Sequence, residues 1–191
     1  EVQSLRRFRD TRILPTFAGG QFMKAFDSFY YSFSPSVAEY VSRSATARST
    51  LKVLLYPLVK IMSLAELASR PFTFNGELGA FTAGMVASLL IGAVYVFPLL
   101  LIALLLMSGR RMLLNRKAIL SLTSLFLGSI LMIIIAEASK SASTMMLATS
   151  VLVLTTISLS SLLLGAAVAK SLSAFKHFLS IRWSSKRFSV G

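Results

Sequence analysis

The sequence has no cysteine and only one histidine, His177, in its 191 residues. Without cysteine, the chain cannot form a disulfide, a thiolate nucleophile or a zinc–thiolate site. A single histidine also excludes a multi-histidine metal centre built from this chain alone. We therefore expect no cofactor, no metal site and no enzyme activity of this chain on its own.

Charged residues are scarce as well. They make up 14% of the chain, against about 25% in typical soluble domains. Only 7 residues are acidic against 20 Lys and Arg, and 55% of the residues are hydrophobic. This composition predicts an all-α integral membrane protein with basic ends rather than a water-soluble domain.

Three apolar runs without a charged side chain are long enough to cross a bilayer, namely residues 79–107, 118–136 and 141–169. A hydrocarbon core of about 30 Å requires about 20 helical residues. The runs are continuously apolar rather than alternating, which predicts helices and not barrel strands. The third run is rich in Ser and Thr, whose hydroxyls can bond to backbone carbonyls one turn back.

Residues 51–70 form an amphipathic pattern. Lys52, Tyr56 and Lys60 fall on one side of a helix, and Leu54, Leu58 and Ile61 fall on the other. This pattern is typical of a helix that lies in the membrane interface. The alternative is a fourth span, which would place Lys60 in the membrane at a cost of ~3 kcal/mol.

Lys and Arg in short loops predict the orientation of the spans, because they are enriched on the cytoplasmic side. The loop after the first span and the basic tail, residues 170–191, should therefore both be cytoplasmic, and the N-terminal region should lie outside the cell membrane. We also expect these cations to bind anionic lipids and not nucleic acid, because they flank the spans. The residues concerned are Arg110, Arg111, Arg116, Lys117, Lys176, Arg182, Trp183, Lys186 and Arg187.

Residues 1–50 are rich in aromatic side chains and predict a small helical cap outside the membrane. Gly19 and Gly20 are expected to break the chain, and a helix is expected over residues 21–33. Ser34 followed by Pro35 then predicts the start of another helix, over residues 35–43.

The same region resembles the CFI-box C-terminal domain family of bacterial and archaeal surface or membrane proteins. The resemblance covers about residues 1–62 and rests on the runs LRRFRD from Leu5, YY from Tyr30 and SPSVA from Ser34. The family's cysteine-containing box is absent and would lie just before Glu1. The resemblance implies an extracytoplasmic domain attached to a membrane anchor, made as a longer precursor, and it implies no activity.

Small residues recur every four positions along the spans and predict faces for close helix packing, because they let backbones approach. The longest such stripe is on the first span, and shorter ones lie on the other two. Their members are Gly76, Ala80, Gly84, Ser88 and Gly92 on the first span, Ser124 and Gly128 on the second, and Ser161 and Gly165 on the third.

Two further features have both a chemical and a plain structural interpretation. Glu137 and Lys140, between the last two spans, suit a turn ion pair better than a proton relay. Met145 and Met146 suit packing better than copper coordination.

These observations favour a non-catalytic accessory subunit of a larger prokaryotic membrane protein complex. A membrane oxidoreductase, such as an ammonia- or methane-type copper monooxygenase, is the kind of complex we expect, although no residue specifies it. Two alternatives remain open at this stage: the membrane anchor of a processed surface protein, and a small transporter or channel with the hydroxyl-rich third span as its lining.

Overall fold

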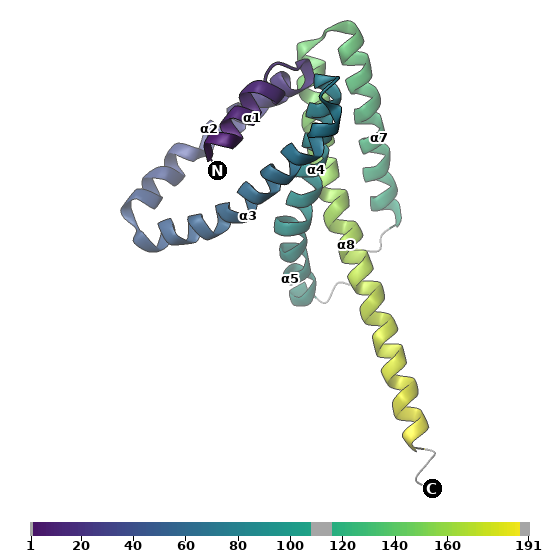
Figure 1. The fold of residues 1–191 in the computed structure, drawn as a ribbon. Helices are drawn as coiled ribbons and strands as arrows, with labels where there is room; N and C mark the ends of the chain where they lie inside the picture. Colours follow the sequence, from purple (N-terminus) through teal and green to yellow (C-terminus); the bar gives the residue numbers. More distant parts are fainter. Residues whose placement is uncertain (1, 108–115, 188–191) are drawn as a thin grey trace.

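A computed structural model describes residues 2–107 and 116–187, and for residues 2, 4, 104–107 and 172–187 it describes the backbone alone. Every element in these ranges is helical (Figure 1). In chain order they are α1 (Val2–Phe8), the π-helical turn η1 (Arg9–Ile13), α2 (Phe17–Arg43), α3 (Ala45–Ser69), the 3-10 turn η2 (Arg70–Phe72), α4 (Gly76–Ile91), the π-helical turn η3 (Gly92–Val96), α5 (Phe97–Met107), α7 (Arg116–Ser139) and α8 (Ala142–Arg187).

Within residues 2–107 and 116–187, three helical segments are long and apolar enough to span a membrane: Gly76–Ala103, Arg116–Ser139 and Ala142–Ser171. These segments agree with the three charge-free runs of the sequence, so the fold class is confirmed as an all-α multi-pass membrane protein. The segment 51–70 is not among the candidate spans. Residues 51–69 belong to α3, which starts earlier than expected, at Ala45, and Arg70 begins η2.

The first span is not a uniform α-helix. It consists of α4, η3 and α5, and in η3 the backbone N–H of Phe97 donates to the carbonyl of Gly92, five residues back. The ring of Pro98 would clash with the carbonyl of Val94 in a regular helix. The wider π-helical turn lies at this point, and π-helical turns are a known way to accommodate such an interruption.

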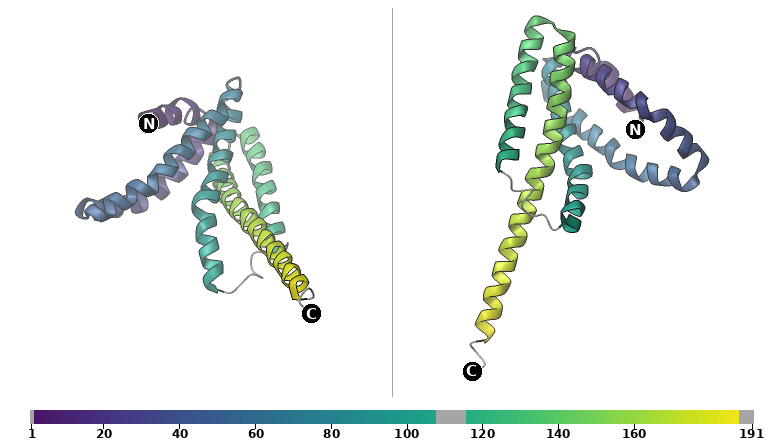
Figure 2. Two further views of the ribbon diagram at one scale, coloured as in Figure 1. Left: turned by 60° about the horizontal axis from the view of Figure 1, so that its bottom comes forward. Right: turned by 180° about the vertical axis from the view of Figure 1, so that it is seen from behind.

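The last two spans form an antiparallel pair, α7 and α8, joined by a tight turn at Lys140. This residue has a φ of 52°, the left-handed conformation that commonly ends a helix. Helix α8 continues as one helix from Ala142 to Arg187 and extends past the other helices of the bundle (Figure 2). The basic segment from residue 170 therefore has a helical backbone through Arg187.

Helices α2 and α3 form a long hairpin that projects away from the bundle in every view (Figures 1 and 2). Ser44 separates them in an extended conformation, and its hydroxyl caps α3 by accepting from the backbone N–H of Ala47 at 3.3 Å. The buried residues of α3, Ile61, Ala65 and Ser69, are all in its C-terminal half, which packs on the bundle.

Two expectations for the N-terminal region are wrong. Pro35 lies inside α2 and does not start a new helix, and Gly19 and Gly20 belong to the first turn of α2 and do not break the chain. The carbonyl of Tyr31, which loses its helical partner to Pro35, is on an exposed stretch of helix where water can bond to it. Gly19 is required for close approach, because a Cβ there would lie 2.4 Å from the carbonyl oxygen of Ile13.

Candidate functional site

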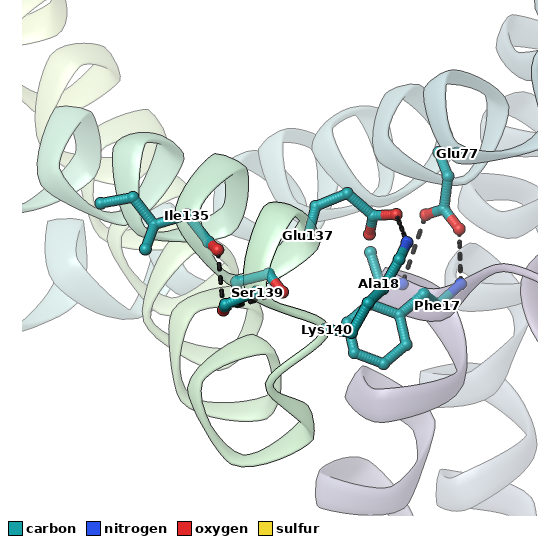
Figure 3. A network of polar contacts seen from close by, with 8 residues as sticks. Phe17, Ala18, Glu77, Ile135, Glu137, Ser139 and Lys140 are labelled. Carbon is teal, nitrogen blue, oxygen red and sulfur yellow. Dashed lines mark hydrogen bonds and ion pairs between the residues drawn. The ribbon is translucent and has the colours of Figure 1, made fainter.

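The N-termini of α2 and α4 meet at one carboxylate, that of Glu77 (Figure 3). Glu77 lies in the first turn of α4, and its oxygens accept hydrogen bonds from the backbone N–H groups of Phe17, at 2.5 Å, and Ala18, at 3.3 Å. These N–H groups open α2 and have no partner within their own helix. A negative charge at this point also complements the positive ends of both helix dipoles.

The α7–α8 turn joins the same junction. Lys140 forms the expected ion pair with Glu137, and its ammonium group lies 5.4 Å from the centroid of the Phe17 ring (Figure 3). The sequence suggested the ion pair but not the contact with Phe17. The junction therefore ties α2, α4 and the α7–α8 turn together at one end of the bundle.

Spans one and three pack most closely at η3. A Cβ on Gly92 would lie 2.5 Å from the carbonyl oxygen of Ile157 and 3.0 Å from the Cβ of Ser160, both on α8. The hydroxyl of Ser160 donates to the carbonyl of Leu89 at 2.8 Å. The bond crosses between the helices, at the point where the π-helical turn begins.

The small residues of the expected packing stripes are distributed unevenly. Ala80, Ser88 and Gly92 on the first span and Ser161 and Gly165 on the third are buried within this chain. Gly76 is exposed, and a Cβ on it would lie 3.4 Å from the methyl group of Thr16. Gly84 and Gly128 have no atom of another element within 4 Å of such a Cβ. Ser124 and Gly128 are exposed and line an open groove of about 670 Å³ between α7 and α8.

The buried hydroxyl groups of the third span donate hydrogen bonds to backbone carbonyls. Thr149, Thr155 and Thr156 are buried, and each donates to a carbonyl one turn back in α8 at 2.7–2.8 Å. Ser160 donates to α4, as described above. Each of these hydroxyls therefore has its hydrogen bonded within the protein.

Of the residues expected at the lipid surface, Arg116 and Lys117 are exposed at the start of α7. Arg110 and Arg111 lie outside the described residues. For Lys176, Arg182, Trp183, Lys186 and Arg187 the side chains lie outside the described part of the chain, although their backbone belongs to α8.

One side of α2 carries a continuous row of exposed apolar and aromatic side chains, which we call the aromatic face. At about 100° per residue they share one side of the helix, and neighbouring rings contact each other, as in Phe29 and Phe33 with centroids 5.2 Å apart. Phe29 is 67% exposed and Tyr40 is 68% exposed. The members are Phe26, Phe29, Tyr30, Phe33, Val37 and Tyr40.

The hairpin has one polar link to the first span besides its packed end. The hydroxyl of Tyr95, in η3, donates to the backbone carbonyl of Leu54, in α3, at 2.5 Å. Pro57 lies one turn further along α3 and interrupts its regular hydrogen bonding. Neither this contact nor the role of Glu77 was apparent from the sequence, because each joins residues that are far apart in the chain.

The chain matches no family model, no curated protein and no solved structure. The resemblance over residues 1–62 therefore stays a prediction. Among the side chains that the structure describes, no three His, Cys, Asp or Glu residues are grouped as potential metal ligands.

Proposed function

We propose that this protein is a non-catalytic subunit of a larger prokaryotic membrane complex and that the α2–α3 hairpin is the arm by which it binds another membrane subunit. The observation that carries this proposal is the aromatic face of α2, on a hairpin that projects from the bundle. Burying such side chains is worth about 1.5–3 kcal/mol each, and aromatic residues are frequent energetic centres of protein interfaces. A partner that covers this face therefore gains substantial binding energy.

The surroundings of the aromatic face favour a protein partner over lipid. Lys24 lies on the opposite side of α2 together with the exposed Tyr31, Asp27 lies beside them, and in α3 the four consecutive residues Val53–Tyr56 are all exposed. Consecutive residues of a helix point about 100° apart, so a flat membrane surface would cover only some of them. Another polypeptide can enclose the arm from several sides.

The same proposal covers the orientation and the partners. We propose that the end of the bundle with Arg116 and Lys117 faces the cytoplasm, following the distribution of Lys and Arg in the loops. The hairpin joins the bundle at the opposite end and runs back beside the first span, where the carbonyl of Leu54 accepts from the hydroxyl of Tyr95 in η3. A complex of the ammonia- or methane-type copper monooxygenase kind would have its copper ligands on other chains, and this subunit would support them.

Site-specific photo-crosslinking in native membranes tests the arm directly. A photoreactive amino acid at Phe29, on the aromatic face, should crosslink to a second membrane polypeptide, which mass spectrometry identifies. The matched control is the same amino acid at Asp27, half a turn away from Phe29, which should give far less of that product. Crosslinks only to lipid at Phe29, or a protein that migrates alone on native gels in mild detergent, would contradict the proposal.

A further inference from the structure

Three arginines from two distant parts of the chain line one pocket at the packed end of the hairpin. The pocket has a volume of about 190 Å³, several times the roughly 30 Å³ that a water molecule occupies in the liquid. It lies between α1 and η1 on one side and the end of α3 with the start of η2 on the other. Its lining consists of Arg7, Phe8, Thr11, Arg12, Glu66, Ser69 and Arg70.

The local fold places these arginines together on a fixed base. Phe8 is buried against Ala65 of α3 and Ala83 of α4, and this cluster anchors α1 and η1 to the bundle. Arg7 and Arg12 are five residues apart, which in a regular α-helix places them about 140° apart. The π-helical turn η1 widens the helix there, as shown by the bond from the N–H of Leu14 to the carbonyl of Arg9, and so brings positions five apart toward the same side.

The pocket has an excess of positive charge. Glu66 is its only carboxylate, and the closest approach between that carboxylate and the guanidinium of Arg70 is 3.8 Å, longer than a hydrogen bond. Arg7 and Arg12 have no ion-pair partner among the residues that the structure describes. By contrast, their neighbour Arg9 bonds to Asp10 at 2.8 Å, which raises the pKa of its guanidinium, and it does not line the pocket.

The remaining polar groups of the lining already have partners. The hydroxyl of Thr11 donates to the carbonyl of Arg7 at 2.8 Å, and that of Ser69 donates to the carbonyl of Glu66 at 2.7 Å. The donors available to a ligand are therefore the guanidinium groups. Their planar arrangement of N–H groups suits a tetrahedral oxyanion, above all phosphate, which two guanidiniums can bind with paired hydrogen bonds.

The geometry points to a phosphate-binding site formed by Arg7, Arg12 and Arg70, with the phosphate group of an anionic lipid as its ligand. Arg70 lies just before the first span, which begins at Gly76, so the pocket is level with the membrane surface, where lipid phosphates lie. Exposed apolar side chains of the same segment of α3, Leu64 and Leu67, are placed to contact acyl chains. This site is at the opposite end of the bundle from the basic residues of the tail.

Binding to the purified, delipidated full-length chain tests the site. The probes are phosphatidylglycerol, phosphatidylcholine and inorganic phosphate, and the readouts are native mass spectrometry of bound lipid and the shift of the unfolding temperature. The double substitution R7Q/R12Q should weaken phosphatidylglycerol binding by about tenfold or more, because it removes charge-assisted hydrogen bonds. The control R6Q removes an arginine of α1 that does not line the pocket and should bind as the wild type does, whereas R7Q, which removes one charge from the same helix, should bind more weakly than R6Q.

A substitution of opposite sign separates the site from general damage to the fold. E66Q removes the only carboxylate of the pocket and should strengthen phosphatidylglycerol binding several-fold, which an unfolded variant cannot do. Tight binding of inorganic phosphate that competes with phosphatidylglycerol would assign the site to free phosphate instead of lipid. Equal losses in R6Q and R7Q/R12Q, or binding unchanged in E66Q and R7Q/R12Q, would overturn the proposal.

Discussion

The bundle and the hairpin of this protein are both built from helices but differ in how these helices are held. Between spans one and three the backbones approach so closely at Gly92 that a Cβ cannot fit without movement. The hairpin instead keeps its aromatic face exposed and depends on its packed end, the cap by Glu77 and the hydrogen bond from Tyr95. We infer that the chain's own stability resides in the bundle, and that the hairpin's free surface is kept for association.

The largest effect should come from enlarging Gly92. In Gly92→Leu the new side chain would meet the carbonyl of Ile157 and the Cβ of Ser160, so α4 and α8 must separate along their crossing. We expect a loss of about 3 kcal/mol in the free energy of unfolding, at the upper end of typical overpacking costs. Unfolding in mixed detergent micelles, followed by circular dichroism, measures it.

Gly84→Leu is the matched control on the same face of the span. A Cβ on Gly84 meets no atom of another element within 4 Å, so this variant should unfold almost as the wild type does. If Gly84→Leu loses assembly with other subunits while it keeps the stability of the purified chain, Gly84 packs against another subunit. Equal stability of Gly92→Leu and wild type would mean that spans one and three do not pack at η3.

The second effect concerns the junction that joins the hairpin to the bundle. Glu77→Ala removes the acceptor of the N–H groups of Phe17 and Ala18 and the charge at the two helix ends. We expect a loss of about 1–2 kcal/mol, in the range of other helix caps, concentrated in α2. Hydrogen exchange of the first turn of α2 should rise in Glu77→Ala and remain unchanged in Glu39→Ala, whose carboxylate pairs only with Arg43 in the same helix.

The spans could be predicted from the sequence because their signal is local. A charge-free run has to be a buried or lipid-facing helix whatever surrounds it, and the turn between the last two spans is visible in Glu137 and Lys140. The path of α2 could not be predicted in the same way. Pro35 and the pair Gly19–Gly20 are local signals for a break, but the capped first turn and the water-accessible carbonyl of Tyr31 let the helix form across them.

The candidate sites were less predictable than the spans, because they depend on contacts between distant residues. Glu77 caps a helix that begins 60 residues earlier in the chain, and Arg70 meets Arg7 and Arg12 only after α3 has returned to the bundle. The stripe of small residues was visible as a pattern, but the pattern does not distinguish Gly92, which packs against α8, from Gly84, where a Cβ would have no neighbouring atom within 4 Å. Small residues that recur every four positions identify a face of a helix, but they do not identify the element that packs against that face.

A smaller effect tests whether the contact between spans one and three includes a polar bond. Ser160→Ala removes the hydrogen bond to the carbonyl of Leu89 and should cost about 0.6 kcal/mol, the average for bonds between helices in membranes. Ser158→Ala is the control, because its hydroxyl bonds only to Leu154 within α8. Equal unfolding free energies of the two variants would show that the close approach at Gly92 depends on packing alone.

The smallest effect on stability, and the largest on association, should come from the aromatic face. Phe29→Ala and Tyr40→Ala change side chains that are mostly exposed, so the unfolding free energy of the purified chain should change by less than about 0.5 kcal/mol. In the complex each truncation should cost about 2 kcal/mol or more, because a buried aromatic side chain is lost from the interface. Copurification of partner subunits should therefore fall in Phe29→Ala and Tyr40→Ala and persist in Asp27→Ala, which lies half a turn from Phe29 on α2. A clear loss of stability in the isolated chain, together with unchanged copurification, would mean that the aromatic face supports the fold of the hairpin and that the arm binds its partner elsewhere.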